Sequence, residues 1–190
     1  VVGTRNSSAA GINITRKICT SLGERGYVVA SGLARGIDTE AHKATLKTGT
    51  IAVVAGGLDV IYPPENKKLF EQIAEQGLVI GENPAGTEPI ARHFPQRNRI
   101  IAGLAAGILV VEAAKKSGSM ITADYALREG REVFAVPGSP LDPRSGGTNY
   151  LIKNGAVLVE DANDIIDNLG KGLAPQLLAL REDEPEFNLN

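Results

Sequence analysis

Residues 93–99 of this 190-residue chain bring together side chains that bind polyanions. The segment contains Phe94, Arg97, Asn98 and Arg99, and His93 stands directly before the ring. A guanidinium group pairs with phosphate through parallel hydrogen bonds, and an aromatic ring offers a face on which a base can stack. These residue types at this spacing indicate a surface that binds a nucleic-acid backbone, without an obvious catalytic group.

The helical period gives the two arginines different roles. At about 100° per residue, Ile100, Ile101 and Leu104 form one apolar stripe, with Arg97 at its leading edge and Arg99 on the opposite side. We expect Arg97 to lie on the first turn, with its stem on the core and its guanidinium aimed at a ligand. Arg99 is expected either to brace a neighbouring loop or carboxylate, or to contact the ligand.

The ring and the histidine at the start of this segment also need a role. Phe94, just before Pro95, is either a plug of the core or a platform for a base. His93 has no partner at metal-ligand spacing, so we expect it to form a hydrogen bond or contact a phosphate.

Glycine, hydroxyl and basic residues recur where we expect strands to end and helices to begin. In open parallel sheets these junctions meet at one edge, where free N–H groups of helices bind anions. The junctions are residues 3–8, 31–38, 56–59, 115–122 and 137–139.

Two arginines and one turn are the candidates at these junctions. Arg5 contacts a ligand or forms a surface ion pair, and Arg35 contacts a ligand or pairs with Asp38 or Glu40 nearby in sequence. The turn at residues 117–119, formed by Ser117, Gly118 and Ser119, supplies phosphate-binding N–H and hydroxyl groups or is an ordinary helix start.

Short β-branched runs alternate with helical patterns along the chain. Strands are expected at residues 1–3, 27–30, 50–54, 78–80, 108–111, 133–136 and 157–159, and helices near residues 9–25, 38–48, 65–76, 96–106, 120–129 and 147–154. Continuous apolar strands with intervening helices predict a mostly parallel sheet covered on both faces. The expected fold is a doubly wound, Rossmann-like α/β domain of three layers.

The composition fits one domain followed by a charged tail. Apolar residues make up 43% of the chain, enough for one sizeable core. Residues 1–159 carry 18 basic and 14 acidic side chains, whereas residues 160–190 carry 2 and 8. We expect a domain at residues 1–169 and an acidic linker at residues 170–190. Because the domain is only mildly basic, a polyanion site must be a local concentration of charge.

Cysteine content and hydropathy indicate the compartment. The single cysteine, Cys19, cannot form an internal disulfide, which is typical of a reducing cytoplasmic setting. No apolar run reaches the roughly 18 residues of a membrane span, and the given sequence shows no signal-peptide pattern. The sequence therefore predicts a cytoplasmic protein with no membrane contact.

Common enzyme motifs are absent. The junction at residues 3–8 lacks the glycine spacing of nicotinamide-binding proteins, and no Walker motif occurs. The two histidines, His42 and His93, and Cys19 are not at metal-ligand or catalytic spacing. We therefore predict no catalytic residue, no metal and no cofactor.

Six ordered motifs resemble one protein family. Together they strongly resemble the DNA-processing protein DprA family, also called Smf, over nearly all of residues 1–169. They are residues 3–5, 31–38, 57–63, 94–104, 117–123 and 130–138.

The resemblance implies an extended Rossmann-like domain that binds single-stranded DNA. It implies a homodimer that protects incoming strands and loads the recombinase RecA during natural transformation. It also implies a small helical domain before this core in many members, and a winged-helix domain after the acidic linker.

Two site residues follow from the resemblance position by position. Arg5 corresponds to the arginine after the first strand, and Phe94 to the aromatic residue before the Arg-Asn-Arg element. Some members place lysines where this chain has Pro64 and Ala91, so the expected nearby substitutes are Lys67, Lys68 and Arg92.

Two other functions remain open. A nucleotide or phosphoribosyl enzyme or sensor on a related fold would use the same crevice for one small molecule, although residues 117–122 lack the glutamate of the similar LOG family. A purely structural interaction module would leave the Arg-Asn-Arg element without a role.

Overall fold

The computed structural model describes residues 1–169, and the predicted linker at residues 170–190 lies outside the described residues. Helices and strands alternate through this part of the chain. The α-helices and strands are α1 (Ala9–Glu24), β1 (Val29–Ser31), α2 (Ile37–Thr45), β2 (Thr50–Val54), α3 (Lys67–Gln76), β3 (Leu78–Gly81), α4 (His93–Leu104), β4 (Gly107–Val110), α5 (Gly118–Arg128), β5 (Glu132–Ala135), α6 (Gly146–Lys153) and β6 (Val157–Leu158). Short 3-10 helices, η1 (Pro64–Asn66) and η2 (Pro143–Ser145), precede α3 and α6.

The strands form two parallel sheets that the N-terminal residues link. The strand orders are β1-β2-β3 and β4-β5-β6. Val2 forms a parallel bridge with Val110, and the nitrogen of Val1 donates to the carbonyl oxygen of Ala30 at 2.7 Å. The expected strand at residues 1–3 is therefore wrong in extent, because pairing is confined to this bridge. Gly3 follows this bridge, and its missing side chain leaves room for Ile37 of α2.

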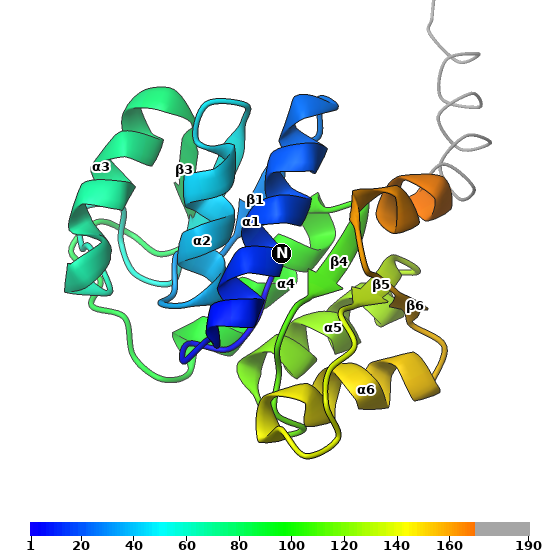
Figure 1. Ribbon diagram of the computed structural model, residues 1–190. Helices are drawn as coiled ribbons and strands as arrows, with labels where there is room; N and C mark the ends of the chain where they lie inside the picture. Colours follow the sequence, from blue (N-terminus) through cyan, green and yellow to red (C-terminus); the bar gives the residue numbers. More distant parts are fainter. Residues whose placement is uncertain (170–190) are drawn as a thin grey trace, which may run out of the picture.

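Helices cover both faces of the sheets (Figure 1). Ile101 of α4, Ala123 of α5 and Leu151 of α6 share one apolar cluster. Ile18 of α1 belongs to another cluster, which also contains Ile165 from a helical segment at residues 162–169. The predicted doubly wound, parallel α/β fold is confirmed.

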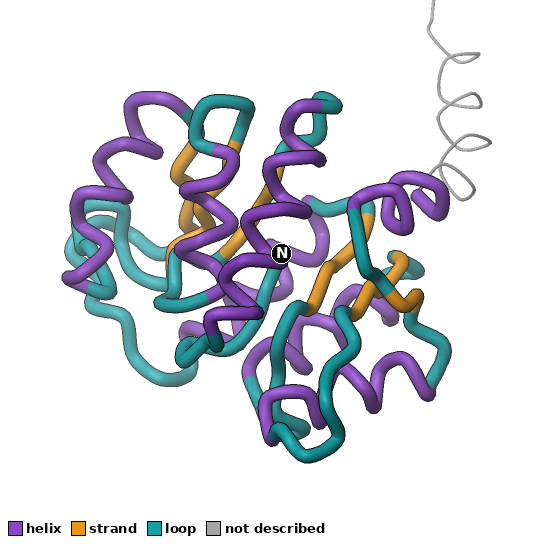
Figure 2. The backbone as a smooth tube through the Cα atoms, viewed as in Figure 1, coloured by secondary structure: helices purple, strands orange, loops and turns teal. Residues whose placement is uncertain are grey.

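The loops that follow the strands gather along the lower edge of Figure 2. This edge carries the N-terminal ends of the helices, and α4 begins there at His93 rather than at the predicted residue 96. Pro95 fits within the first turn because its missing N–H would have no partner there. Arg97 consequently lies on the second turn of α4, and not on the first turn as expected.

Hydropathy along the helices adds one observation. Within residues 1–169, no helix has the length and apolar character required to span a membrane.

Candidate functional site

A cleft of about 550 Å³ opens between the loop after Val2 and the N-terminal ends of α4 and α5. Residues from three separate predicted segments line it. They include Arg5, Phe94, Arg97, Asn98, Ser117, Gly118 and Ser119. The structure thus brings together residues from the beginning, the middle and the later part of the sequence.

A side pocket adjoins the cleft. Arg5, Phe94 and Arg97 line both hollows, while Arg35 and Tyr62 line only the side pocket. The boundary between the hollows therefore includes two arginines and an aromatic ring.

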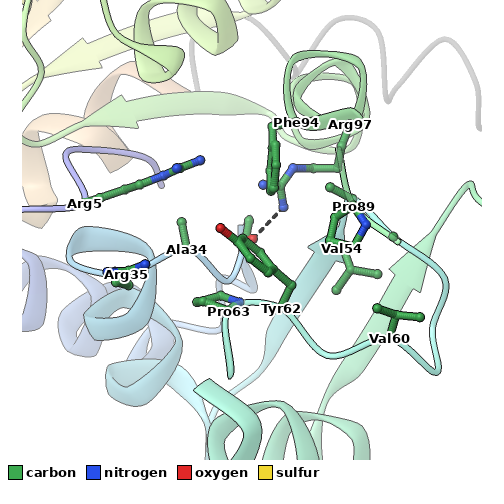
Figure 3. A pocket seen from close by; sticks show the side chains of 13 residues that line it. Arg5, Ala34, Arg35, Val54, Val60, Tyr62, Pro63, Pro89, Phe94 and Arg97 are labelled. Atoms are coloured by element: carbon green, nitrogen blue, oxygen red, sulfur yellow. Dashed lines mark hydrogen bonds between the residues drawn. The ribbon is translucent and has the colours of Figure 1, made fainter. Parts of the chain in front are cut away.

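At this boundary, Arg5 and Tyr62 both lie against the ring of Phe94 (Figure 3). The guanidinium carbon of Arg5 lies 5.3 Å from the centre of the Phe94 ring, a cation–π contact. The ring centres of Phe94 and Tyr62 are 5.5 Å apart, with an angle of 52° between the planes. Arg5 is exposed and forms no ion pair within residues 1–169, and Phe94 is half-buried. The ring is therefore neither enclosed in the core nor fully free.

Arg97 also lines the cleft, but its guanidinium binds protein groups. The side chain is only 7% exposed, and its Nη1 donates to the carbonyl oxygens of Gly32, at 2.6 Å, and Val53. Burial lowers the pKa of Arg97 to about 10, although the nearby carboxylate of Asp38 opposes this shift. The guanidinium of Arg97 therefore does not point at a ligand, contrary to expectation. It links α4 to the ends of β1 and β2 instead.

A buried carboxylate occupies the loop after β1. Asp38 accepts the N–H groups of Gly32 at 3.1 Å and Ala34 at 3.3 Å. Leu33 between them has φ 58°, the left-handed conformation that lets flanking N–H groups converge on one anion. Burial raises the pKa of Asp38, while the charge of Arg97 and these N–H groups act in the opposite direction. A loop of the kind that often holds phosphate here holds the protein's own carboxylate.

The turn before α5 leaves the helix N-terminus open. Ser117, the N-cap residue, makes no capping hydrogen bond through its side chain, and its buried Oγ has no partner within the described residues. The hydroxyl of Ser119 instead donates to the carbonyl oxygen of Gly3 at 3.0 Å. Asn98 donates to the carbonyl oxygen of Gly118 at 3.2 Å, which joins α4 to this turn. The first N–H groups of α5 remain available at the wall of the cleft.

Three other predicted cations form exposed ion pairs. Arg35 pairs with Glu65 at 3.1 Å, and not with Asp38 or Glu40 as expected, because Asp38 holds backbone N–H groups and Glu40 pairs with Arg16 and Lys43. The other two pairs are Arg99 with Glu82 and Lys67 with Glu71, the latter at 3.9 Å. Bracing of a carboxylate by Arg99 is therefore confirmed.

Four predicted site residues line neither hollow: Lys67, Arg92, His93 and Arg99. His93 accepts the N–H of Ile90 through Nδ1 at 3.4 Å, and Arg92 is exposed directly before α4.

Sequence reasoning also missed two residues that line the hollows. Tyr62 stands in the segment 57–63 that follows β2, so its position after a strand was a usable signal. Asp38 lay in the predicted junction 31–38, but its contacts with N–H groups could not be foreseen because they depend on the left-handed residue at 33.

Comparison with known families identifies the chain. Residues 1–170 match the family described as DNA recombination-mediator protein A. The chain belongs to this family. The resemblance drawn from the six motifs is therefore confirmed.

Individual relatives agree with this assignment. The DNA processing protein DprA of Bacillus subtilis is 47% identical over 171 residues, which cover 89% of this chain and 58% of the relative. An X-ray structure of DNA processing protein A from Streptococcus pneumoniae has a TM-score of 0.82 at 46% identity, covering 87% of this chain and 59% of that chain.

The match to a second solved structure spans a larger share of that structure's chain. This structure is the Helicobacter pylori DNA processing protein A, described for its single-stranded DNA binding mode, with a TM-score of 0.83 at 32% identity over 90% of this chain and 78% of that chain. The present chain spans about half the length of the curated relatives it matches: 43% of the Smf protein of Synechocystis, and 58% and 59% of the DprA proteins of Bacillus subtilis and Streptococcus pneumoniae.

Proposed function

We propose that the cleft binds single-stranded DNA. The observation that carries this proposal is the stack of Arg5 on Phe94 beside the open N-terminus of α5. These groups match the two chemistries of a single strand, because cations and N–H groups bind phosphate and an aromatic ring binds a base. The Helicobacter pylori relative, whose description names single-stranded DNA binding, supports the same function.

Binding exchanges the contact between Arg5 and Phe94 for two stronger ones. An exposed cation–π contact contributes about 0.5–1 kcal/mol. A charged hydrogen bond to phosphate contributes about 1.5–3 kcal/mol, and a stacked base about 1–3 kcal/mol. An incoming strand therefore gains free energy when the guanidinium turns to a phosphate and a base takes its place on the ring. The turn at Ser117, Gly118 and Ser119 holds a second phosphate.

The remaining cations act around this centre. In this proposal Arg97 and Asn98 hold α4, and hence Phe94, in place. Arg35, Lys67, Arg92 and Arg99 attract the strand where it enters and leaves the cleft, and His93 forms a hydrogen bond with it. Exposed ion pairs contribute little to stability, so Arg35, Lys67 and Arg99 can exchange their carboxylates for phosphates at low cost.

The whole protein that contains this chain would use the site without catalysis. We infer that it is a homodimer that holds one strand at two clefts, which raises its affinity through effective concentration. It would protect incoming DNA and load RecA onto it during natural transformation, as the resemblance implies.

The rival function is the binding of a single nucleotide or phosphoribosyl compound. The cleft volume of about 550 Å³ would hold such a molecule. However, the carboxylate of Asp38 occupies the N–H groups after β1 that could hold its phosphates. Affinity that grows with oligonucleotide length supports the single-strand function, whereas saturation at one nucleotide supports the rival.

The decisive experiment substitutes Arg5 and measures oligo-dT binding by fluorescence anisotropy at several salt concentrations. Arg5→Ala should weaken binding about 10-fold or more and lower the magnitude of the log–log salt slope by roughly 0.7, the value for one phosphate contact. Arg25→Ala is the matched control, because this exposed arginine follows the C-terminal end of α1, away from the cleft. Unchanged affinity of a folded Arg5→Ala variant would refute the proposal.

A further inference from the structure

Tyr62 offers an aromatic surface that the proposed contacts do not use. The residue follows β2, is 41% exposed and lines the side pocket. Its ring lies next to Phe94 in Figure 3, with a ring-centre distance of 5.5 Å. Within residues 1–169 no hydrogen bond to its hydroxyl is found, so the polar end of the ring is free for another partner.

The two rings are too close to hold a base between them. Successive stacked bases are about 3.4 Å apart, so a base between two parallel rings needs a separation of about 7 Å. At 5.5 Å and 52°, Phe94 and Tyr62 pack on each other instead. Arg5 covers Phe94 as well, at 5.3 Å. A base on Phe94 and a base on Tyr62 must therefore be two different bases.

The backbone around Tyr62 is already fixed. Pro63 is buried directly after it, and η1 follows. The side-chain amide of Asn66, at the end of η1, donates to the carbonyl oxygen of Leu33 at 2.9 Å. This bond ties the segment after Tyr62 to the loop after β1. An exposed aromatic side chain on a fixed segment binds a ligand at little cost in conformational entropy.

We propose that Tyr62 is a second base contact, which binds the nucleotide next to the one on Phe94. The inference rests on the proposed function and extends it. Arg5, Phe94 and Tyr62 then form one track, along which a single strand places a phosphate and two successive bases. The contact is independent of sequence, because every base has an aromatic face.

Affinity measurements test the contact first. Tyr62→Leu should weaken oligo-dT binding about 5- to 150-fold, the range expected for loss of one stacked base. Tyr62→Phe should bind like the parent, since it keeps the ring. Leu58→Ala is the matched control, because Leu58 lies on the same loop, is 49% exposed and lines neither hollow.

A double-mutant cycle separates a base contact from mere support of Phe94. If Tyr62 binds a base itself, Tyr62→Leu weakens binding in a Phe94→Leu background about as much as in the parent. If Tyr62 only positions the ring of Phe94, its substitution has no effect in that background. The second result overturns the inference.

Photocross-linking identifies the contact directly. Oligo-dT with one 5-iodo-deoxyuridine should label trypsin fragment 93–97 when the iodinated nucleotide is at one position of the oligonucleotide. It should label fragment 48–67 when that nucleotide is at the adjacent position. The aromatic residue of the first fragment is Phe94 and that of the second is Tyr62. Absence of label from fragment 48–67, with label present in 93–97, overturns the inference.

Failure of this inference is distinct from failure of the proposed function. A parent protein that does not bind oligo-dT refutes both. A parent that binds oligo-dT and depends on Arg5 and Phe94, but not on Tyr62, retains the proposed function and loses only the second contact.

Discussion

The contact between Gly32 and Arg97 explains why a glycine follows β1 in this chain. A Cβ atom added at Gly32 would lie 2.6 Å from atoms of the Arg97 guanidinium. The same guanidinium donates to the carbonyl oxygen of Gly32. The absent side chain therefore makes room for a buried charge that holds α4 against the strand ends.

Gly32→Ala should lower the free energy of unfolding by about 1–3 kcal/mol, because the guanidinium must move from its two carbonyl acceptors. Urea unfolding measures the change. In an Arg97→Met background the same substitution should cost clearly less, since the group that the Cβ meets is gone. Equal costs in the two backgrounds would show that the guanidinium does not limit this position.

The side of its helix on which Arg97 lies could be predicted from the sequence, but the direction of its side chain could not. The sequence placed Arg97 at the edge of the apolar stripe of α4, and the structure places it there. Its acceptors, Gly32 and Val53, are 65 and 44 residues away in sequence, so no local pattern could show that the guanidinium turns inward. Arg35 shows the same limit, because its carboxylate partner lies in η1.

At the scale of elements, contacts between loops hold the cleft in shape. Gly36, with φ +74°, lies against the loop that carries Arg5, where an added Cβ would be 2.3 Å from the carbonyl oxygen of Thr4. On the other side, the carboxylate of Glu112 accepts the N–H and hydroxyl of Ser8 at 3.0 and 2.5 Å. The position of Arg5 thus depends on loops from both sheets.

Helix α2 contains a buried histidine that links stability to pH. His42 is fully buried, and its Nδ1 lies 2.7 Å from the hydroxyl oxygen of Thr50. The hydroxyl of Thr50 donates its proton to the carbonyl oxygen of Val29, so it can only accept a hydrogen bond from His42. Nδ1 of the neutral His42 ring is therefore the donor. Burial, reinforced by the charge of Arg97, lowers the pKa of His42 to about 3.

The neutral ring should make the protein less stable as pH falls. The unfolded chain binds a proton at His42 below about pH 6.5, whereas the folded protein does not until about pH 3. The stabilisation is complete above pH 6.5 and decreases as pH falls toward 3. Between pH 7 and pH 5 the free energy of unfolding should fall by about 2 kcal/mol relative to His42→Gln. Parallel urea titrations that keep the difference constant over this range would contradict the assignment.

The elements themselves were predicted best where the sequence signal is local. Apolar runs indicated β2 and β5 within one residue of their observed bounds. Helix α4 begins three residues before the predicted residue 96, because the first turn of a helix accepts a proline such as Pro95. The strand at residues 1–3 was overestimated because its pairing depends on Val110, far away in sequence.

At the scale of the whole molecule, the cleft lies where the two sheets meet. Val2 bridges to β4, and the chain then passes directly to Arg5 at the wall of the cleft. The chain carries a net charge of −2, so the attraction of a polyanion depends on local cations against an acidic background.

Removing acidic charge from the C-terminal segment should speed the association with DNA. Replacing Glu182, Asp183, Glu184 and Glu186 by their amides changes the net charge of the chain from −2 to +2. Association rates with oligo-dT, measured by stopped-flow fluorescence, should rise several-fold at low ionic strength. At about 1 M salt, where the Debye length is about 3 Å, variant and parent should associate equally fast. An increase that persists in high salt would exclude long-range attraction as its cause.

The half-buried ring of Phe94 determines which form of DNA the proposed site accepts. In a double helix each base is paired at its edge and covered on both faces by its neighbours, so it cannot reach a ring set inside a hollow. Extruding such a base costs a few kcal/mol, which offsets most of the free energy gained by stacking the base on one aromatic side chain. Discrimination against duplex DNA then follows from the depth of the ring alone, without any contact that recognises the sugar or the sequence.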